Sequence, residues 1–402
     1  MRVLISGASI AGPVLAYWLT RYGHEVTVVE RAPQPRKTGG HSVDLWRPAL
    51  DIVERMGLLS AVRQRSITTE RTLAYRPGVR RPASIDNTKI FTAVSDRHLE
   101  IMRDDLSEIF YDATRDTTEY VFADSLTSIS ESGDVTFEHG RPRRFDLVIG
   151  ADGLHSTVRR LAFGPESRFT DWVGAYLAVA SVPRDLARNG VIIAHFDVGR
   201  TAMMYTAPHL QDARVLFLFR TERPLDYHHR DADRQKTLLR EHFAGHDGHV
   251  PRWLAELDQT PSFYFDSITQ VRLDTWSRGR VALVGDAGLS PGPAIGASTS
   301  LAVLSAYVLA GQLAEAAGDH IRAYAAYQSE LEEFVQRSRA FARGMAKTLL
   351  PSHRLGLSLL VNGTELATRL PSGMTRWLAT LNSGGVRLFD TFPVRDYQPR
   401  TP

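Results

Sequence analysis

The first thirty residues alternate between short apolar runs and one amphipathic segment. Val3–Ile5 is an apolar run. The next segment places Leu15 and Leu19 on one face at helical spacing and ends at Gly23. A β-branched run, Val26–Val29, follows it. This order predicts a strand, a helix and a parallel second strand, which together form a βαβ crossover.

The apolar pattern also predicts elements along the rest of the chain. In chain order these are a helix over 48–56, strands and turns over 66–93, a helix over 103–113, a meander over 121–137, buried strands over 145–150 and 214–220, a helix over 233–243, a buried strand over 281–284, and almost only helix beyond 296. Strands that alternate with helices favour an α/β fold.

Composition limits the function without naming it. The chain has 402 residues, enough for two domains or for one domain with a large insertion. Its net charge is +3 without a run of like charges, so nucleic-acid binding has no electrostatic support. It has no cysteine, which excludes disulfides, thiolate metal sites and a cysteine nucleophile. We find no targeting segment and no apolar run long enough to span a membrane, and we expect a cytoplasmic monomer or homodimer.

Candidate chemistry begins at the turn between the first strand and the first helix. Gly7-x-Ser9-x-x-Gly12 matches the dinucleotide fingerprint G-x-G-x-x-G, with serine in place of the middle glycine. Gly7 allows a sharp turn, Gly12 allows close packing, and the small residues between them let backbone N–H groups approach a pyrophosphate. Glu30, at the end of the second strand, is an acid where such folds bind an adenosine ribose.

Three later motifs extend this site. Arg103 opens a predicted helix, one strand runs into an Asp-Gly turn at 152–153, and another ends in Gly-Asp at 285–286 before a proline-rich turn. Together with the fingerprint, this set resembles the class A flavoprotein monooxygenases. That group has the para-hydroxybenzoate hydroxylase fold and includes the tetracycline-inactivating flavin enzymes. The resemblance extends from residue 2 to about residue 313.

The resemblance implies FAD as the cofactor and NAD(P)H as a transient co-substrate. In such a site Glu30 and the fingerprint hold the ADP half of FAD, Arg103 contacts the pyrophosphate and ribityl region, and Asp286 binds the ribityl hydroxyls. Asp152 and Gly153 support both FAD and the nicotinamide nucleotide. The cofactor-binding residues expected on this basis are Gly7, Ser9, Ile10, Ala11, Gly12, Glu30, Arg31, Arg103, Asp152, Gly153, Gly285, Asp286, Gly296 and Ala297.

The resemblance also implies the fold class, α/β, with a Rossmann-like FAD-binding domain, an inserted mixed β-sheet substrate domain and a helical C-terminus. We expect residues 1–65, 97–165 and 271–345 to form the discontinuous FAD-binding domain. Residues 66–96 and 166–270 would form the substrate domain, and 346–402 the helical C-terminal region. The chain is expected to end before the thioredoxin-like domain that some relatives carry.

The implied activity is oxygenation of an aromatic or polyketide-like small molecule. NAD(P)H would reduce FAD, O2 would add at the flavin C4a, and the resulting hydroperoxide would hydroxylate an electron-rich carbon. A wet pocket would lose the hydroperoxide as hydrogen peroxide, so the cavity must exclude water. From strand position, Met203, Tyr205, Phe217 and Arg220 are candidate cavity walls.

The candidate catalytic residues are His41, Asp44, Pro293 and Arg220. Pro293 is expected beside the isoalloxazine ring, whereas His41 and Asp44 are candidate bases near the flavin edge. Epoxidation, Baeyer-Villiger oxidation and dehydrogenation on the same fold stay open. A non-catalytic flavin-binding or ligand-binding protein also stays open, because Ser9, Leu289 and Ser298 depart from the family pattern. Ser300 also replaces the asparagine of the family.

Two other patterns are interpreted as structural. Residues 243–253 fit the F-x-G-x-x-x-H-x-x-x-W signature of Baeyer-Villiger monooxygenases, but the second dinucleotide fingerprint of that family is missing. Residues 226–233 contain aspartates and histidines, but adjacent histidines point apart and Asp231 or Asp233 can cap the following helix. We therefore expect no metal site.

Overall fold

A six-stranded sheet forms the centre of one half of the molecule. The computed structural model describes residues 1–402 except 36–39, 96, 229–230, 293–297, 371–391 and 399–402. The strand order is β18 (Ser277–Arg278), β19 (Val281–Leu283), β12 (Leu147–Gly150), β1 (Arg2–Ser6), β2 (Glu25–Glu30) and β8 (Glu119–Phe122). All neighbours pair in parallel except β18 with β19. The carboxyl ends of β1, β2 and β12 therefore meet at one edge, where the fingerprint turn begins.

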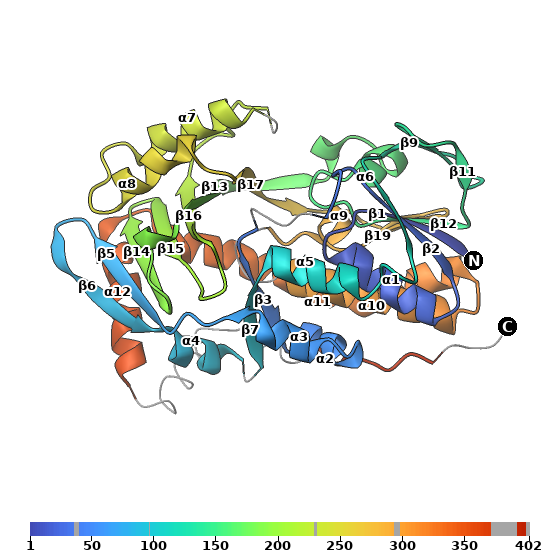
Figure 1. Ribbon diagram of the computed structural model, residues 1–402, viewed down its shortest axis with the longest axis horizontal. Helices are drawn as coiled ribbons and strands as arrows, with labels where there is room; N and C mark the ends of the chain where they lie inside the picture. Colours follow the sequence, from blue (N-terminus) through green and yellow to red (C-terminus); the bar gives the residue numbers. More distant parts are fainter. Residues whose placement is uncertain (36–39, 96, 229–230, 293–297, 371–391, 399–402) are drawn as a thin grey trace.

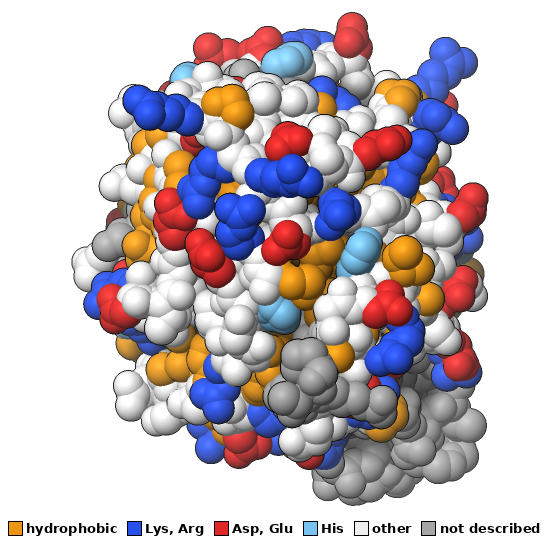
Figure 2. Space-filling model, turned by 90° about the vertical axis from the view of Figure 1, so that its right-hand side faces the viewer, with side chains coloured by type: hydrophobic (Ala, Val, Ile, Leu, Met, Phe, Trp, Pro, Cys, Tyr) orange, Lys and Arg blue, Asp and Glu red, His pale blue; other side chains and the backbone are white. Residues whose placement is uncertain are grey.

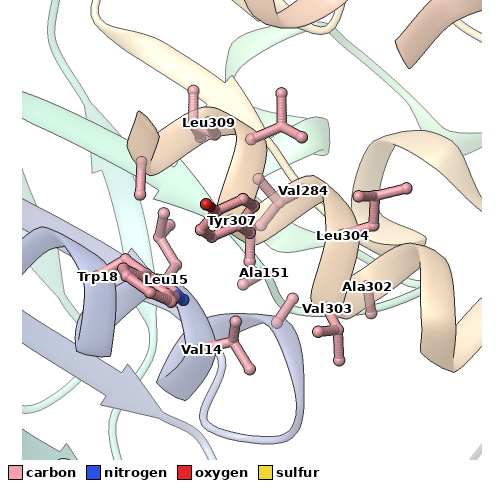
Figure 3. Close-up of a cluster of buried hydrophobic side chains, with 14 of the residues drawn as sticks. Val14, Leu15, Trp18, Ala151, Val284, Ala302, Val303, Leu304, Tyr307 and Leu309 are labelled. Atoms are coloured by element: carbon pink, nitrogen blue, oxygen red, sulfur yellow. The ribbon is translucent and has the colours of Figure 1, made fainter. Parts of the chain in front are cut away.

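Helices α1 (Ala11–Arg21) and α10 (Ser298–Glu315) pack against each other beside this sheet. In Figure 3, Val14, Leu15 and Trp18 of α1 face Val303 and Tyr307 of α10. The Trp18 and Tyr307 rings meet edge to face with centroids 4.9 Å apart. Nearly every residue of α10 is buried, which is the pattern of a helix enclosed by protein on all sides.

A seven-stranded mixed sheet forms the other half (Figure 1). Its order is β17 (Phe263–Val271), β13 (Thr170–Pro183), β16 (Asp212–Arg220), β15 (Arg200–Tyr205), β14 (Val191–Asp197), β5 (Arg71–Arg76) and β6 (Val79–Asp86). Only β14 and β5 pair in parallel. One face packs on α7 (Ala232–Phe243) and α8 (Val250–Ala255), in a core that contains Phe217, Phe243 and Trp253.

The remaining elements connect and cover these sheets. A small sheet of β3 (Ser42–Trp46), β7 (His98–Met102) and β4 (Ser66–Ile67) lies between the halves, and β9 (Leu126–Ile129), β10 (Asp134–Phe137) and β11 (Arg143–Arg144) form a separate antiparallel sheet. The other helices are α2 (Arg47–Arg55), α3 (Leu59–Gln64), α4 (Asn87–Val94), α5 (Arg103–Asp112), α6 (Thr157–Ala162), α9 (Asp286–Leu289), α11 (His320–Leu349) and α12 (Arg354–Arg369). Short 3-10 turns are Glu166–Arg168, Arg184–Leu186 and Glu256–Asp258.

The architecture confirms the predicted α/β class, with a mixed second sheet and helices toward the C-terminus. Two local predictions were wrong in part. The stretch 66–93 contains predicted strands, β4, β5 and β6, but also a helix, α4, whose first turn is capped by the Asp86 carboxylate accepting from the Lys89 N–H. The stretch 121–137 is not one meander, because β8 leaves β9 and pairs in parallel with β2. Apolar periodicity does not reveal which strand becomes the partner.

The surface mixes charges of both signs. On the face shown in Figure 2, lysine and arginine side chains lie among aspartates and glutamates rather than in one basic patch. None of the helices in the described part of the chain is long and apolar enough to cross a membrane.

Candidate functional site

The fingerprint turn depends on two glycines for different reasons. Gly7 has φ = 109°, a conformation that side chains strain, and a Cβ there would lie 2.4 Å from the Ala151 carbonyl oxygen. A Cβ on Gly12 would lie 1.9 Å from the Gly7 carbonyl oxygen. Both glycines therefore let β1, β12 and α1 approach more closely than any side chain permits.

The N-terminus of α1 is left open by this turn. Its N-cap residue, Ile10, makes no side-chain capping hydrogen bond, so first-turn N–H groups have no side-chain acceptor there. Glu30 lies beside this turn, where its two carboxylate oxygens accept from the backbone N–H groups of Ala8 and Ala32, each at 2.9 Å. Arg31 is exposed. The helix N-terminus suits a pyrophosphate, and the remaining lone pairs of Glu30 suit ribose hydroxyls.

Ser9, the departure from the family glycine, connects the fingerprint to α5. Its hydroxyl accepts from the Arg103 guanidinium at 3.1 Å, and its carbonyl accepts from the Ser107 hydroxyl at 3.1 Å. The Arg103 backbone N–H donates to the His41 carbonyl at 3.0 Å. The serine thus holds the arginine against the turn.

The two aspartate motifs have different environments. Asp152 accepts from the hydroxyls of Ser6 and Ser156 and from the Val158 N–H, so its carboxylate holds its own turn together. Asp286 is half-buried, and desolvation raises its pKa, an effect that nearby Arg103 opposes. Gly285 precedes it with φ = 57°, and the backbone N–H of Gly285 donates to the Ser305 hydroxyl.

These motifs converge on one cavity of about 280 Å³. Its cofactor side includes Ser9, Ile10, Ala11, Arg103, Gly153 and Asp286. Its other side includes Ile192, Met203, Tyr205, Leu216 and Tyr264. Gly7, Gly12 and Asp152 shape the turns behind the lining rather than the lining itself. Pro293, Gly296 and Ala297 lie outside the described residues.

The two candidate bases both line this cavity. Burial, followed by the Arg103 charge, lowers the pKa of His41 to about 4, so its imidazole is neutral at physiological pH. One Asp44 carboxylate oxygen lies 2.7 Å from the His98 Nε2. The His98 ring lies against both Trp46 and Phe91, with each pair of ring centroids 4.4 Å apart.

Glu100 is a cavity residue that the sequence prediction missed. Its carboxylate accepts from the Thr69 hydroxyl at 3.1 Å. Burial and then Asp44 raise the pKa of Glu100 to about 7. The signal in the sequence was the alternation in 98–102, which puts Glu100 on one face of a strand.

Two predicted wall residues lie away from the cavity. Phe217 points to the other face of the sheet, where its ring meets Phe243 with centroids 5.0 Å apart. Arg220 is exposed, and its guanidinium donates to the Leu350 carbonyl at 3.3 Å. Their neighbour Leu216 lines the cavity instead, since successive strand residues point to opposite faces.

The residues of the Baeyer-Villiger-like pattern pack against that other face of the sheet. His249 Nδ1 lies 2.8 Å from His195 Nε2, and the His249 ring stacks on Trp253. A Cβ on Gly248 would lie 2.5 Å from the His195 ring. None of these residues lines the cavity, so the pattern packs α7 and α8 on the sheet. The Asp231 carboxylate caps α7 by accepting from the Arg234 N–H, in agreement with the capping prediction.

Ser300, another departure, anchors α10 to β3. Its hydroxyl donates to the Asp44 carbonyl at 3.1 Å and accepts from the Trp46 N–H at 3.0 Å. Ser9 and Ser300 thus both make specific hydrogen bonds, Ser9 in the cavity lining and Ser300 behind it.

The residues present fit FAD. An uncapped helix N-terminus, an acid beside it, a half-buried aspartate that feels the charge of Arg103, and close-packing glycines match the pyrophosphate, ribose and ribityl groups. These features lie in the order along the chain that the sequence predicted.

Comparison with known proteins also indicates an FAD-binding protein. A family model described as FAD binding domain matches residues 1–347. An uncharacterized protein of Mycobacterium tuberculosis (strain ATCC 25618 / H37Rv) is 43% identical over 344 residues, which cover 84% of this chain and 91% of that protein. A flavin-dependent monooxygenase of Legionella longbeachae is 32% identical over 353 residues, which cover 87% and 90%. The crystal structure of tetracycline destructase Tet(51) matches with a TM-score of 0.83 and 29% identity, covering 98% of this chain and 99% of that one.

Proposed function

Because the chain belongs to the FAD-binding-domain family of flavin-dependent monooxygenases, we propose that it uses NAD(P)H and O2 to hydroxylate an aromatic or polyketide-like small molecule. Bound FAD supplies the electron transfer from NAD(P)H and the activation of O2. The protein's part is to hold FAD, place the substrate and exclude water.

One observation carries this proposal: a single cavity has a cofactor side and an apolar side. Ile192, Met203 and Leu216 belong to three neighbouring strands and form a surface for a ring system. Tyr264 adds an aromatic side chain from β17. A flat organic substrate in this half would lie against the flavin and displace water from it.

The cofactor is held by groups that need little rearrangement. The α1 N-terminus would face the pyrophosphate, Glu30 the adenosine ribose, and Asp286 the ribityl hydroxyls. Arg103, fixed by Ser9, would add a positive charge near the phosphates.

The substrate class follows from likeness to a structure whose name states its activity. Tet(51) is a tetracycline destructase, and tetracycline carries phenol and enol groups on fused rings. We therefore propose a phenolic or enolic ring compound as the substrate of this chain. NADH and NADPH are both to be tested as donors.

The test is substrate-stimulated oxidation of NADPH or NADH by the FAD-loaded protein, with tetracycline and a panel of simple phenols. We expect at least one compound to accelerate NAD(P)H oxidation and to gain one oxygen atom from isotopically labelled O2, as mass spectrometry detects. The Asp286→Ala variant should lose FAD and this activity together. Oxidation that yields only hydrogen peroxide with every compound, or no flavin reduction by either nucleotide, would contradict the proposal.

A further inference from the structure

Two carboxylates face each other across the small sheet between the two sides of the cavity. β3 and β7 pair antiparallel, and the register puts Asp44 directly opposite Glu100. Directly opposite residues project from the same face of a sheet. Both residues line the cavity, next to Ser42 and close to His41 and Arg103. The pair therefore lies where the cofactor side and the substrate side meet.

The two carboxylates have different partners. Asp44 is held by His98, which is itself fixed between Trp46 and Phe91. Among the residues that the structure describes, the hydrogen-bond donors to Glu100 are neutral, namely the hydroxyls of Thr69 and Ser42. No lysine or arginine within the described ranges forms an ion pair with Glu100. An anionic Glu100 is thus opposed by Asp44, and the nearby His98 offsets this effect only in part.

Other charged and titratable groups surround Glu100. Asp44 faces it from β3, His98 precedes it on β7, and Tyr205 approaches from β15 through Ser42, whose N–H donates to the Tyr205 hydroxyl at 2.6 Å. Arg103 and His41 line the same cavity, but Arg103 is directed to Ser9. Burial and Asp44 raise the pKa of Glu100 to about 7, so above that pH it is a stronger base than an ordinary glutamate.

From this geometry we infer that Glu100, with Asp44 opposite it, is the catalytic base that accepts the proton of an acidic hydroxyl on the substrate. The inference rests on the proposed function and names the substrate group that this site recognises: a phenol or an enol. Asp44 is a positioning residue, because its charge keeps Glu100 ready to take a proton and His98 keeps Asp44 in place.

The proton transfer is balanced without any other reactant. The O–H bond of the substrate breaks, the proton forms a new bond to a Glu100 carboxylate oxygen, and the electron pair stays on the substrate oxygen. The phenolate or enolate is richer in electrons at its ring or vinyl carbon, which is where an electrophilic oxygen is accepted. The proton on Glu100 returns to the product oxygen when the hydroxylated ring forms.

A binding measurement tests this step without any electron transfer. The probe is para-hydroxyacetophenone, whose ultraviolet absorbance changes on ionisation, added to the oxidised FAD-loaded protein in a weak buffer with a pH indicator. The experiment is run at about pH 7.5, where Glu100 is mostly ionised and a phenol in water is mostly not. The absorbance reports the charge of the bound probe, and the indicator reports any proton released to solvent.

We expect the wild-type protein to bind a minor fraction of the probe, on the order of a tenth, as phenolate, because the pKa of Glu100, about 7, lies below that of the phenol. No proton should be released, because Glu100 retains the transferred proton. Glu100→Gln keeps the size of the side chain but should bind the probe as neutral phenol, with the phenolate fraction reduced roughly tenfold or more. Asp44→Asn should give an intermediate phenolate fraction. Glu119→Gln is the matched control and should behave as wild type, since Glu119 lies on β8 of the six-stranded sheet, pairs with Arg143 and does not line the cavity.

The other outcomes overturn the inference. They are an unchanged phenolate fraction in Glu100→Gln, release of one proton to the indicator, no detectable phenolate form of the bound probe in the wild type, or no binding of this phenol at all. If the probe binds as phenolate but no phenol stimulates NAD(P)H oxidation, the proposed function fails while the proton acceptor stands.

Discussion

The two sides of the cavity are built in different ways. On the cofactor side, Ser9, Ile10 and Ala11 are consecutive residues of one turn. On the substrate side, Ile192, Met203 and Leu216 are single residues from three strands. The first side depends on backbone conformation and close packing, whereas the second depends on which face each strand presents. We therefore expect a substitution on the cofactor side to abolish FAD binding or folding, and a substitution on the substrate side to change stability or substrate binding by a smaller amount.

The largest effect is expected from Gly12→Ala. The new Cβ would lie 1.9 Å from the Gly7 carbonyl oxygen, and both partners are backbone that cannot rotate away. We expect FAD affinity to fall by roughly 100-fold or more, or folding to fail, measured as flavin content and by quenching of flavin fluorescence.

Gly344→Ala is its control. This glycine lies within α11, and a Cβ there meets nothing within 4 Å. Alanine is the better helix former, so the variant should keep FAD and gain up to about 1 kcal/mol. Equal FAD affinity in Gly12→Ala and wild type would remove the contrast between the two sides.

A pair of neighbouring substitutions tests the substrate side. Phe217 is fully buried against Phe243, so Phe217→Ala should cost about 3–5 kcal/mol in the free energy of unfolding. Leu216→Ala removes a side chain that lines the cavity, and it should cost less, about 1–2 kcal/mol, while weakening substrate binding. Urea unfolding and substrate titration separate the two. A larger loss of stability in Leu216→Ala than in Phe217→Ala would mean that the two faces of β16 are assigned wrongly.

Glu100→Gln tests whether the charge of Glu100 lowers the free energy of unfolding. The folded-state pKa, about 7, is above the ordinary value of 4.5, so the folded protein binds this proton more tightly than the unfolded chain. Wild-type stability therefore falls as pH rises from 4.5 to 7. The variant should be more stable than wild type by about 1–3 kcal/mol above pH 7 and equal to it below pH 4.5. Thermal unfolding of both proteins across this pH range tests the prediction. A stability difference that is the same at all pH values would contradict an effect of the Glu100 charge.

The smallest effect is expected at His155, which joins the Asp-Gly turn of the cofactor side to β17. Its two ring nitrogens lie 3.1 Å from Asp266 and 3.0 Å from Glu166. These hydrogen bonds, Asp266 first, raise its pKa to about 10. The charged His155 therefore contributes its full stabilisation of the folded protein below pH 6.5, and this stabilisation is lost as pH rises through about 10. The side chain is 45% exposed, so solvent screening leaves about 1 kcal/mol. His155→Gln should show this loss in urea unfolding below pH 6.5 and little near pH 10.

Local sequence was enough to predict the cofactor side. The strand, the helix and the second strand of the first thirty residues are present as β1, α1 and β2, and Arg103 and Asp286 reach the same cavity. Each of these features is specified by residues within one turn or one element. The roles of these residues toward FAD and substrate stay predictions.

The substrate side could not be predicted in the same way. The alternation in 214–220 gave two faces, but nothing within the strand says which face meets α7 and which meets the cavity. Phe217 was predicted as a cavity wall but lies on the opposite face of the strand. Arg220 was also predicted there but lies at the exposed end of the strand. Glu100 was missed because its importance comes from Asp44, a residue 56 positions away that only the β3–β7 register brings opposite it.

The strand order of the parallel sheet has a consequence for the growing polypeptide on the ribosome. β1 is synthesised long before its neighbour β12, which begins at Leu147, and before the next strand, β19, which begins at Val281. The helix that covers α1 begins later still, at Ser298. The nucleotide turn is therefore synthesised well before β19 and α10, the elements that complete its surroundings, and we expect cofactor loading to follow the synthesis of α10.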